Sequence, residues 1–521
     1  MKKKIALLLA LTLLCGCFAG CGNVSDEAYV PTGNALVMEG QDPDSVGPQK
    51  EEEPQELTLA YYPERGMNPL TCNDYTNRVL FSLMYQNMFN VKADYSVEPI
   101  LCGKYKVSAS YRTWVFYVDE KATFSDGTPV TAEDVLATYQ AAKESGYYSG
   151  RFTHVHAMEL TEDGGVAFYL TTAYENLPQL LDIPILKAEQ VASEHPIGSG
   201  PYVLSDSLSG AHLVRSPLWW CKDRKIIVTA QTVGLVEAED PAHIRDQFEF
   251  YDVGLVCADP CSDMYADFRC DYELWDIDNG IFIYLACNTR YVDFLEDTTL
   301  RAMLTYGINR DKIVKENFEG YAQAVTLPAD PSSPYYSKSL ASRYDYDPGK
   351  FVEFLGRYGK TEKPIRLLVN ADDSVRLRIA KDIATTFSDM GLPMEVVEAT
   401  TTKFQQYLYN ANYDLYLGVT KLSANMDLSP FFAPYGTLSR NGISDEATYS
   451  LCLESLANQG NYYNLHKAVA DEGRIIPIAF FSYEVYATRG LLTDLDPARD
   501  NVFCYSLGKT MQSIQIPTDY N

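Results

Sequence analysis

Strand and helix signals alternate from residue 57 to the end of the chain, and this alternation most constrains the fold. Apolar runs and alternating patterns predict strands at 57–61, 113–118, 166–170, 365–369, 414–417 and 475–481. Apolar residues at helical spacing predict helices at 132–143, 300–306, 311–318 and 376–390. Gly391 stands where a glycine would end the last of these helices. Strands interleaved with helices predict an α/β fold.

The length of this region predicts more than one lobe. It holds about 465 of the 521 residues, whereas single hydrophobic cores stop growing at roughly 250–300 residues. The sequence contains no internal repeat and no second low-complexity linker. We therefore expect the chain to pass between the lobes several times. We do not expect consecutive domains joined by single linkers.

The first 21 residues have the pattern of an export signal. Three lysines at 2–4 precede an apolar run at 5–14, which is too short to span a bilayer because a span needs about 20 residues. Phe18-Ala19-Gly20-Cys21 follows and resembles a bacterial lipobox, in which the cysteine is acylated. We predict lipidation at Cys21 and anchoring to the outer face of the bacterial cell membrane. A register ending at Cys17, or plain secretion, stays open.

Residues 22–55 predict a flexible tether between this anchor and the folded body. They are rich in Pro, Gly, Ser, Asp and Glu and show no apolar periodicity, which is the composition of a disordered segment. No other stretch of the chain is apolar for about 18 residues, so no second membrane segment is expected.

The chain is strongly acidic, with 70 Asp and Glu against 43 Lys and Arg and a net charge of −27. Nucleic-acid-binding proteins present a basic patch, so we expect no nucleic-acid partner. The acidity suits a soluble body facing outward, although net charge says nothing about the fold.

The cysteines and histidines do not predict a metal centre or a catalytic site. Cys257, Cys261 and Cys270 form a cluster that could hold one disulfide, but spacing does not determine the pairing. Zinc sites use closely paired cysteines or nearby histidines, and His154-Val155-His156 fits a surface strand or loop better. The sequence contains no zincin, G-x-S-x-G or phosphate-loop motif. We therefore expect a protein without a cofactor that is not an enzyme.

Residues 114–135 carry the most specific pattern in the chain. A strand at 114–118 precedes Asp126-Gly127, where glycine permits a tight turn. Thr131 then stands as the expected N-cap of the helix that follows. We expect this segment to be scaffold, with a core formed by Trp114, Phe116 and Phe124.

This segment and several others resemble, in order, the family 5 solute-binding proteins, which include the oligopeptide-, dipeptide- and nickel-binding proteins of ABC importers. The resemblance covers roughly residues 57–510. The other matching segments are 67–70, 196–202, 248–256, 284–289, 300–302, 307–314, 344–348 and 475–479.

The resemblance implies a periplasmic-binding-protein-like type II fold (cluster C) of the α/β class. Two large lobes would close about a hinge, with a smaller lobe set on the first, and the chain would cross between the large lobes near 275–285 and 470–480. The implied domains are a signal peptide and lipobox at 1–21, a tether at 22–55, lobe I at 56–75, 190–278 and 476–521, a small extra lobe at 76–189, and lobe III at 279–475.

The resemblance also implies a function. The chain would be a monomeric, lipid-anchored substrate-binding protein of an ABC importer. It would capture a peptide, a peptide-like molecule or another small polar solute by hinge closure and deliver it to the membrane permease subunits. The alternative is an extracytoplasmic receptor or sensor of signalling peptides with the same fold.

In peptide-binding relatives, an aspartate in the third lobe grips the α-amino group of the peptide, and the stretch that matches it here is 418–432. Anchoring the match on Asp427 places Ala424 or Ser423 where that aspartate would be. Ordinary peptides are therefore poor candidates, because a buried ammonium without a counter-ion is costly. Lys421 instead predicts an anionic or hydroxylated ligand group.

Six residues are the predicted ligand contacts. Three belong to the third lobe: Lys421, Asn425 and Asp427. Asp427 is either a ligand acceptor or a helix cap. The other three leave the first strand on the facing side: Tyr61, Arg65 and Asn68. Arg65 could grip a carboxylate with its planar guanidinium, or it could be a solvated loop residue.

Overall fold

The computed structural model describes residues 57–207, 210–259, 268–318, 321–359, 363–492, 495–507 and 512–516. The predicted signal, the tether and Cys21 lie outside these residues. The folded elements all belong to one compact unit, Lys50–Asn521. No helix within the described residues is both long enough and apolar enough to cross a membrane.

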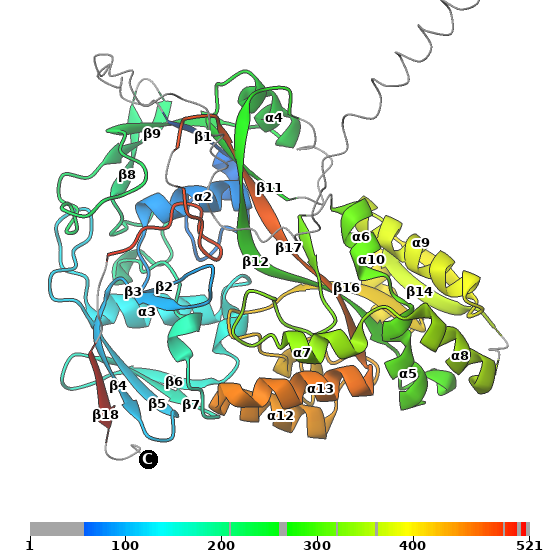
Figure 1. The fold of residues 1–521 in the computed structure, drawn as a ribbon. Helices are drawn as coiled ribbons and strands as arrows, with labels where there is room; N and C mark the ends of the chain where they lie inside the picture. The colour runs from blue at the N-terminus through cyan, green and yellow to red at the C-terminus, as the bar shows by residue number, and fades with distance from the viewer. Residues whose placement is uncertain are drawn as a thin grey trace, which may run out of the picture. The chain divides into compact units, whose positions relative to one another are not determined.

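An 11-stranded mixed sheet is the main feature of this unit (Figure 1). Ten strands follow one another along it, and the eleventh, β13 (Ala322–Ala324), pairs with β17. In sheet order the ten strands are β15 (Met394–Ala399), β14 (Ile365–Asn370), β16 (Leu415–Lys421), β12 (Tyr272–Cys287), β17 (Ile475–Thr488), β11 (Leu255–Ala258), β1 (Thr58–Tyr61), β10 (Thr232–Glu237), β9 (Gly210–Arg215) and β8 (Tyr202–Ser207).

Strands β12 and β17 are much longer than their neighbours and join the two halves of the sheet. They pair antiparallel from Tyr272↔Thr488 to Ile277↔Tyr483, and again from Ile281↔Phe481 onward, with an irregularity between the two stretches. Gly280 adopts a positive φ of 65° at this irregularity, a conformation that costs glycine little. We call this place the sheet crossing. The chain was predicted to cross between the large lobes near 275–285 and 470–480. The sheet crossing falls within the first range in β12 and just beyond the second range in β17.

Each half of the sheet combines parallel strands with helices, which confirms the α/β prediction. In one half, β1 is parallel to both β10 and β11, and α4 (Pro241–Glu249) packs beside β11. In the other half, β14 is parallel to β15 and β16. There α9 (Ser374–Asp389) and α10 (Thr401–Tyr409) cover the strands.

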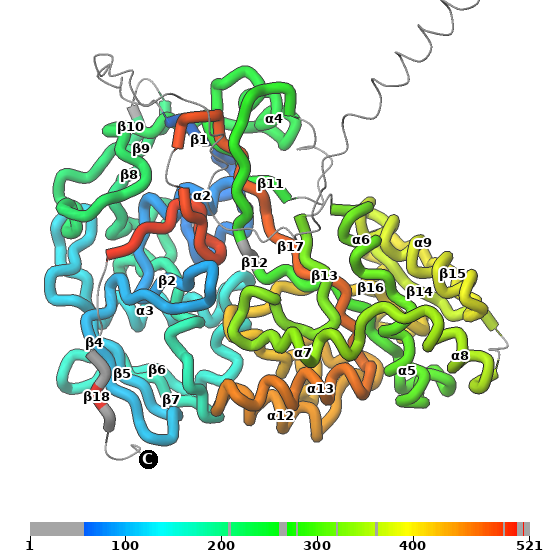
Figure 2. Tube along the Cα trace, viewed as in Figure 1, coloured from blue at the N-terminus to red at the C-terminus, as the bar shows by residue number. Residues whose placement is uncertain are grey.

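The remaining helices of this second half surround its core. Figure 2 traces their path, with α12 and α13 packed against each other. Helices α5 and α6 begin one or two residues before their predicted starts, because Asp297 and Asn309 cap their first turns. The bounds are α5 (Thr298–Leu304), α6 (Arg310–Asn317), α7 (Lys338–Ala341), α8 (Pro348–Tyr358), α11 (Ser429–Phe432), α12 (Glu446–Ala457) and α13 (Tyr462–Glu472).

A separate five-stranded sheet holds the predicted scaffold segment. Its order is β18 (Gln512–Ile516), β4 (Cys102–Ser108), β5 (Thr113–Val118), β7 (Val166–Leu170) and β6 (Val155–Leu160). The predicted core residues Trp114, Phe116 and Phe124 are all buried in one cluster. Strand β18 pairs with β4, so residues 512–516 belong to the small sheet, a pairing that the predicted boundary of 476–521 for lobe I did not include. The other predicted domain boundaries stay a prediction.

Helix α3 (Ala132–Lys143) has the predicted bounds and the predicted start. The Thr131 hydroxyl accepts a hydrogen bond from the backbone N–H of Asp134, and the Asp134 carboxylate accepts one from the backbone N–H of Thr131. This reciprocal capping box satisfies two backbone donors that the helix itself leaves free. The turn before it contains Gly127 at φ +84°, as the Asp-Gly pair predicted.

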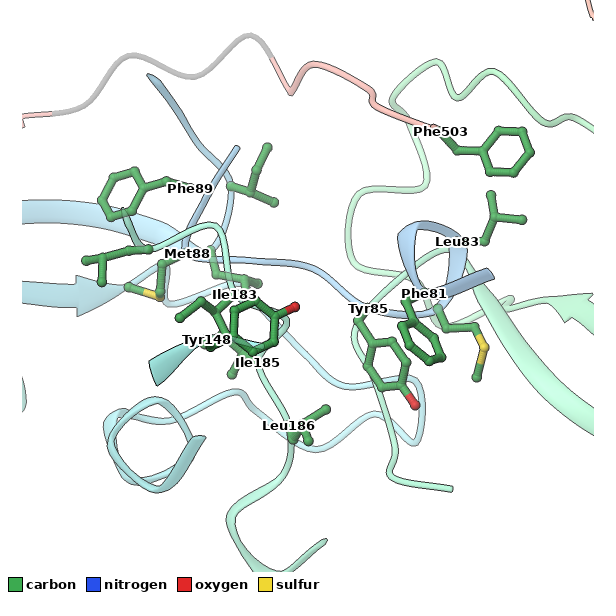
Figure 3. Close-up of a cluster of buried hydrophobic side chains, with 14 of the residues drawn as sticks. Phe81, Leu83, Tyr85, Met88, Phe89, Tyr148, Ile183, Ile185, Leu186 and Phe503 are labelled. Carbon is green, nitrogen blue, oxygen red and sulfur yellow. The ribbon is translucent and has the colours of Figure 1, made fainter. Parts of the chain in front are cut away.

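Helix α2 (Tyr75–Met84) and the short hairpin of β2 (Phe89–Val91) and β3 (Val97–Pro99) connect the two sheets. Figure 3 shows part of the apolar cluster around them, including Phe81, Tyr85 and Tyr148. The loop with Gly200 closes over the end of α2, where the Gly200 N–H donates to the Met84 carbonyl over 2.9 Å. A Cβ on Gly198 would lie 2.1 Å from that same carbonyl oxygen, so the glycines of this loop have a structural role.

Candidate functional site

Three adjoining cavities lie beside the sheet crossing, with volumes of about 50, 100 and 170 Å³. Arg151 lines all three, and Lys421 lines the second and the third. Arg499 and Asp500 line the first and the second. The three cavities therefore adjoin one another, and together they are the candidate site, which we call the crossing site. Each is smaller than the roughly 300–1,000 Å³ of pockets for drug-sized ligands.

Charged side chains converge on the crossing site from distant parts of the sequence. Six of them line its first two cavities: the cations Arg78, Arg151, Lys421 and Arg499, and the carboxylates Asp182 and Asp500. Arg78 comes from α2, Lys421 from the end of β16 and Arg151 from the 3-10 helix η2 (Ser149–Phe152), and the other three come from loops. The chain as a whole carries a net charge of −27, so a local excess of cations is unusual for it.

Asp500 is the centre of this group. Its carboxylate binds Lys421, and its Oδ2 atom lies 3.9 Å from Nη2 of Arg151. Burial disfavours the charged form, but Lys421, Arg499 and Arg151 outweigh it and lower the pKa of Asp500. The backbone of Asp500 has a φ of +60°, a left-handed conformation that is uncommon outside glycine and is often found at functional sites.

Arg151 and Asp182 form a second ion pair, in which both side chains are nearly buried. The Arg151 guanidinium also donates to the carbonyl oxygens of Leu180 and Asp182, over 3.5 and 3.4 Å. Burial is the largest influence on Asp182 and raises its pKa, although Arg151 opposes the shift. The pair therefore holds Arg151 at the place where the three cavities meet.

Arg78 is held by neutral groups. Its Nη1 atom donates to the carbonyl oxygens of Pro69 and Cys72, over 3.1 and 3.0 Å, and its Nη2 atom donates to the Tyr148 hydroxyl. The guanidinium also lies 3.7 Å from the ring centroid of Tyr147. No carboxylate of a described residue lies within 4 Å of it. Arg78 is thus a half-buried cation without an ion-pair partner among the described residues.

Tyr147 connects the cations at the two ends of this group. One contact is the Arg78 guanidinium over its ring, and the other is Nζ of Lys421, which lies 4.9 Å from the ring centroid and donates to the Tyr147 hydroxyl over 2.9 Å. Cations bind favourably to the face of an aromatic ring, so Tyr147 helps to position both.

The third cavity contains a histidine–aspartate pair. Nε2 of His154 lies 3.0 Å from Oδ2 of Asp427, and Oδ1 of Asp427 accepts a hydrogen bond from the backbone N–H of Ser429 over 2.8 Å. Burial would raise the pKa of Asp427, but His154 and Ser429 outweigh it and lower the pKa. Asp427 therefore contacts the first turn of α11 and also faces the cavity.

The structure brings together three of the six predicted contact residues. Lys421, Asn425 and Asp427 all line the crossing site, as do Ser423 and Ala424. The buried side-chain oxygen of Asn425 accepts from the backbone N–H of Asp427 over 3.3 Å. The segment 421–427 is therefore part of the lining of the crossing site.

The other three predicted residues have partners elsewhere and are not among the residues that line these cavities. The Tyr61 hydroxyl donates to Glu237 over 3.1 Å, and burial, the largest influence, raises its pKa to about 12. Arg65 binds Asp74 and stacks on Tyr62. The Asn68 amide donates to two backbone carbonyls of the 191–193 segment. A 3-10 helix, η1 (Pro63–Arg65), follows β1 here, which the strand signal did not reveal.

Sequence reasoning missed most of the charged group: Arg78, Arg151, Asp182, Arg499 and Asp500. These residues are spread over more than 400 positions, and no spacing rule connects them. The available signals were weak: an arginine in an apolar helix, and Arg499-Asp500 in a stretch rich in turn-forming residues.

The described residues contain no group of three or more His, Cys, Asp or Glu side chains placed to hold a metal ion. Cys257 is buried and Cys270 is half-buried, and both are free thiols. The bridge that their spacing allowed is therefore not formed between these two. Cys261 lies outside the described residues.

Residues 96–442 match the family described as bacterial extracellular solute-binding proteins, family 5 Middle. The chain is 25% identical over 334 residues to the nickel-binding periplasmic protein of Escherichia coli, which covers 59% of this chain and 62% of that protein. It is 32% identical over 160 residues to a binding protein of Brucella melitensis, covering 27% of this chain and 26% of that protein.

Solved structures show the fold. The substrate-binding protein CtaP of an ABC transporter from Listeria monocytogenes superposes with a TM-score of 0.71 at 18% identity, covering 86% of this chain and 97% of that one. Together with the mixed sheet described above, this likeness shows the type II fold of the periplasmic binding proteins, as predicted.

Proposed function

Because the chain belongs to the bacterial extracellular solute-binding proteins of family 5, we propose that it captures a small polar solute outside the cytoplasm and delivers it to the permease of an ABC importer. The observation that carries this proposal is the crossing site. Charged side chains from five separate stretches line adjoining cavities there, next to the place where the chain passes between the two halves of the main sheet.

Rotation of the two halves about the sheet crossing would open and close such a site. Among the strands of the described residues, only β12 and β17 run through both halves of the sheet, and their pairing is irregular at Gly280. Changes in φ and ψ at a few such positions let lobes rotate as rigid bodies. The contacts Lys421–Asp500 and His154–Asp427 join segment 421–427 to other parts of the chain, so opening would break both.

The solute would be bound by charge and hydrogen bonds and would leave chemically unchanged. Ser423 and Ala424, at the position matching the amine-gripping aspartate of peptide-binding relatives, offer no carboxylate. Asp182 and Asp500 are the carboxylates that line the same cavity. A ligand amine would therefore contact one of these two residues and not segment 423–424.

Native mass spectrometry of the purified full chain tests the proposal. We expect a fraction of the protein to carry one small solute, which is released by denaturation and returns with unchanged mass after incubation with the protein. A protein that carries no solute, and takes up none from an extract of growth medium, would contradict capture. Conversion of the solute by the protein would contradict binding without chemistry.

Lipid anchoring is a second, independent expectation. If Cys21 is acylated, cells fed radiolabelled palmitate should label the protein, and Cys21→Ala should abolish the label and release the protein into the medium. Cys17→Ala is the matched control, because it changes the neighbouring candidate and should leave labelling intact. Labelling that survives Cys21→Ala but not Cys17→Ala would assign the anchor to Cys17.

A further inference from the structure

Arg151 and Asp500 leave a hydrogen-bond donor and an acceptor unused at the same place in the crossing site. Nη2 of Arg151 lies 3.9 Å from Oδ2 of Asp500, which is too far for a hydrogen bond. The hydrogen bonds of the Arg151 side chain to described residues all come from Nη1, and Oδ2 of Asp500 accepts none within this part of the chain. The two side chains are only 12% and 9% exposed, and both line the first two cavities.

A hydroxyl group suits this gap better than an ammonium group. A hydroxyl both accepts and donates, so it can accept from Nη2 of Arg151 and donate to Oδ2 of Asp500. An ammonium only donates, and it would lie beside the Arg151 guanidinium and beside Lys421, which binds Oδ1 of the same carboxylate. Both cations would repel it. Because buried polar atoms are nearly always paired, we expect the ligand to place a hydroxyl here.

Asn501 adds a second acceptor next to this gap. Its Oδ1 atom is buried and accepts no hydrogen bond within the described residues. Asn501 lines the first cavity together with Asp500. A ligand with a second hydroxyl would satisfy this oxygen, so the acceptors of the site favour a molecule with several hydroxyls over a molecule with one.

Arg78 indicates that the same ligand is an anion. A guanidinium has five N–H donors, and three of those of Arg78 are used, by the carbonyl oxygens of Pro69 and Cys72 and by the Tyr148 hydroxyl. One donor on Nε and one on Nη2 are left without an acceptor among the described residues, and Arg78 lines the first cavity. Guanidinium donors match the two oxygens of a carboxylate, so Arg78 can bind one.

We infer that the solute is a polyhydroxylated monocarboxylate, the class to which the sugar acids belong, with its carboxylate at Arg78 and its hydroxyls at Arg151–Asp500 and at Asn501. This inference rests on the proposed function and names the solute class. Cavities of about 50–170 Å³ suit a compact molecule of this kind better than an extended peptide.

Calorimetry with the purified full chain tests the inference directly. The sugar-acid probes are D-gluconate and D-glucuronate. Hexanoate has the carboxylate and chain length of gluconate without its hydroxyls, and D-glucitol has the hydroxyls without the carboxylate. L-alanyl-L-alanine supplies an ammonium, and D-glucose 6-phosphate supplies a phosphate. We expect at least one sugar acid to bind at least about tenfold more tightly than each of the other four, because each of these lacks or replaces a charge-assisted hydrogen bond.

Arg78→Gln should weaken binding of the sugar acid about tenfold to hundredfold and should reduce its preference over D-glucitol. The control Arg357→Gln changes an arginine whose side chain is 79% exposed on α8 and should leave both affinities unchanged.

Asn501→Ala keeps the inference testable if Arg78→Gln does not fold, because Oδ1 of Asn501 has no hydrogen bond within the described residues to lose. It should weaken binding of the sugar acid about twofold to tenfold, the effect of one neutral hydrogen bond. Binding of hexanoate should not change.

Several results would overturn the inference. Equal binding of hexanoate and gluconate would show that water alone fills the gap beside Asp500. Tighter binding of L-alanyl-L-alanine or D-glucose 6-phosphate would assign the site to an ammonium or a phosphate, and binding of neither sugar acid would exclude the class. In these cases capture stands if native mass spectrometry finds another solute, whereas a protein that binds no solute at all would contradict the capture function itself.

Discussion

Gly280→Ala is expected to destabilise the folded protein by about 2–5 kcal/mol. The residue has a φ of +65°, and a left-handed backbone costs a side-chain-bearing residue about 1–2 kcal/mol. The new Cβ would also lie 2.7 Å from the Leu422 carbonyl oxygen and 2.1 Å from Nη2 of Arg499. Overpacking of this kind typically costs about 1–3 kcal/mol. The urea midpoint of the purified protein measures the change.

The same substitution should also weaken solute binding, because the Arg499 side chain must move away and it lines two cavities of the crossing site. The control variant Gly391→Ala separates the effect of the steric clash on stability from the effect of the backbone strain. Gly391 has a φ of +97°, but a Cβ there would meet no atom within 4 Å, so only the strain of about 1–2 kcal/mol is expected. Equal midpoints for the two variants would contradict the close packing at the sheet crossing.

His466→Leu is expected to remove a large acid-dependent loss of stability. His466 is fully buried on α13, and neither ring nitrogen has a hydrogen-bond partner within the described residues. Burial alone lowers its pKa to about 3. The unfolded chain takes up the proton near pH 6.5, where the folded chain does not.

The sign of the effect follows from this difference in proton uptake. Above pH 6.5 the residue is neutral in both states and its contribution to stability is fully present. As the pH falls below 6.5 the unfolded state is favoured by about 1.4 kcal/mol per pH unit, until the folded pKa near 3 is reached. At pH 5 the loss from this residue is therefore about 2 kcal/mol.

Urea unfolding at pH 7.5 and pH 5.0 measures the effect. Between pH 7.5 and pH 5.0, the free energy of unfolding of the wild-type protein should fall by about 2 kcal/mol more than that of His466→Leu. Val469→Ala, in the same helix and equally buried, is the matched control: it should lower stability by the same amount at both pH values. An identical pH dependence for His466→Leu and the wild-type protein would show that the histidine does not titrate in this range.

The fold was largely predictable because its elements depend on local patterns. The strands at 113–118 and 166–170 and the helix at 132–143 have the predicted bounds, since each combines strong periodicity with a cap or a turn. The length of β12 and β17 was not predictable. Their apolar patterns weaken at the sheet crossing, whereas in the structure the two strands pair with each other on both sides of it.

The site was predictable only where one segment contributes several residues. Lys421, Asn425 and Asp427 lie close together in sequence and were found together. Arg78, Arg151 and Asp500 line one cavity only because α2, the 3-10 helix after α3 and the segment before β18 fold against one another. Arg65 was predicted to bind a carboxylate of the ligand. In the structure it binds the carboxylate of Asp74 and stacks on Tyr62, and neither residue lines the crossing site.

X-ray scattering tests the central claim most directly, because capture between the two halves of the sheet requires the protein to close. The full chain is measured without solute and with the solute identified by native mass spectrometry, at a concentration that saturates binding. We predict a smaller radius of gyration and a shorter maximum dimension with the solute, and the solute recovered unchanged. Saturating binding that leaves the scattering curve unchanged would contradict the account.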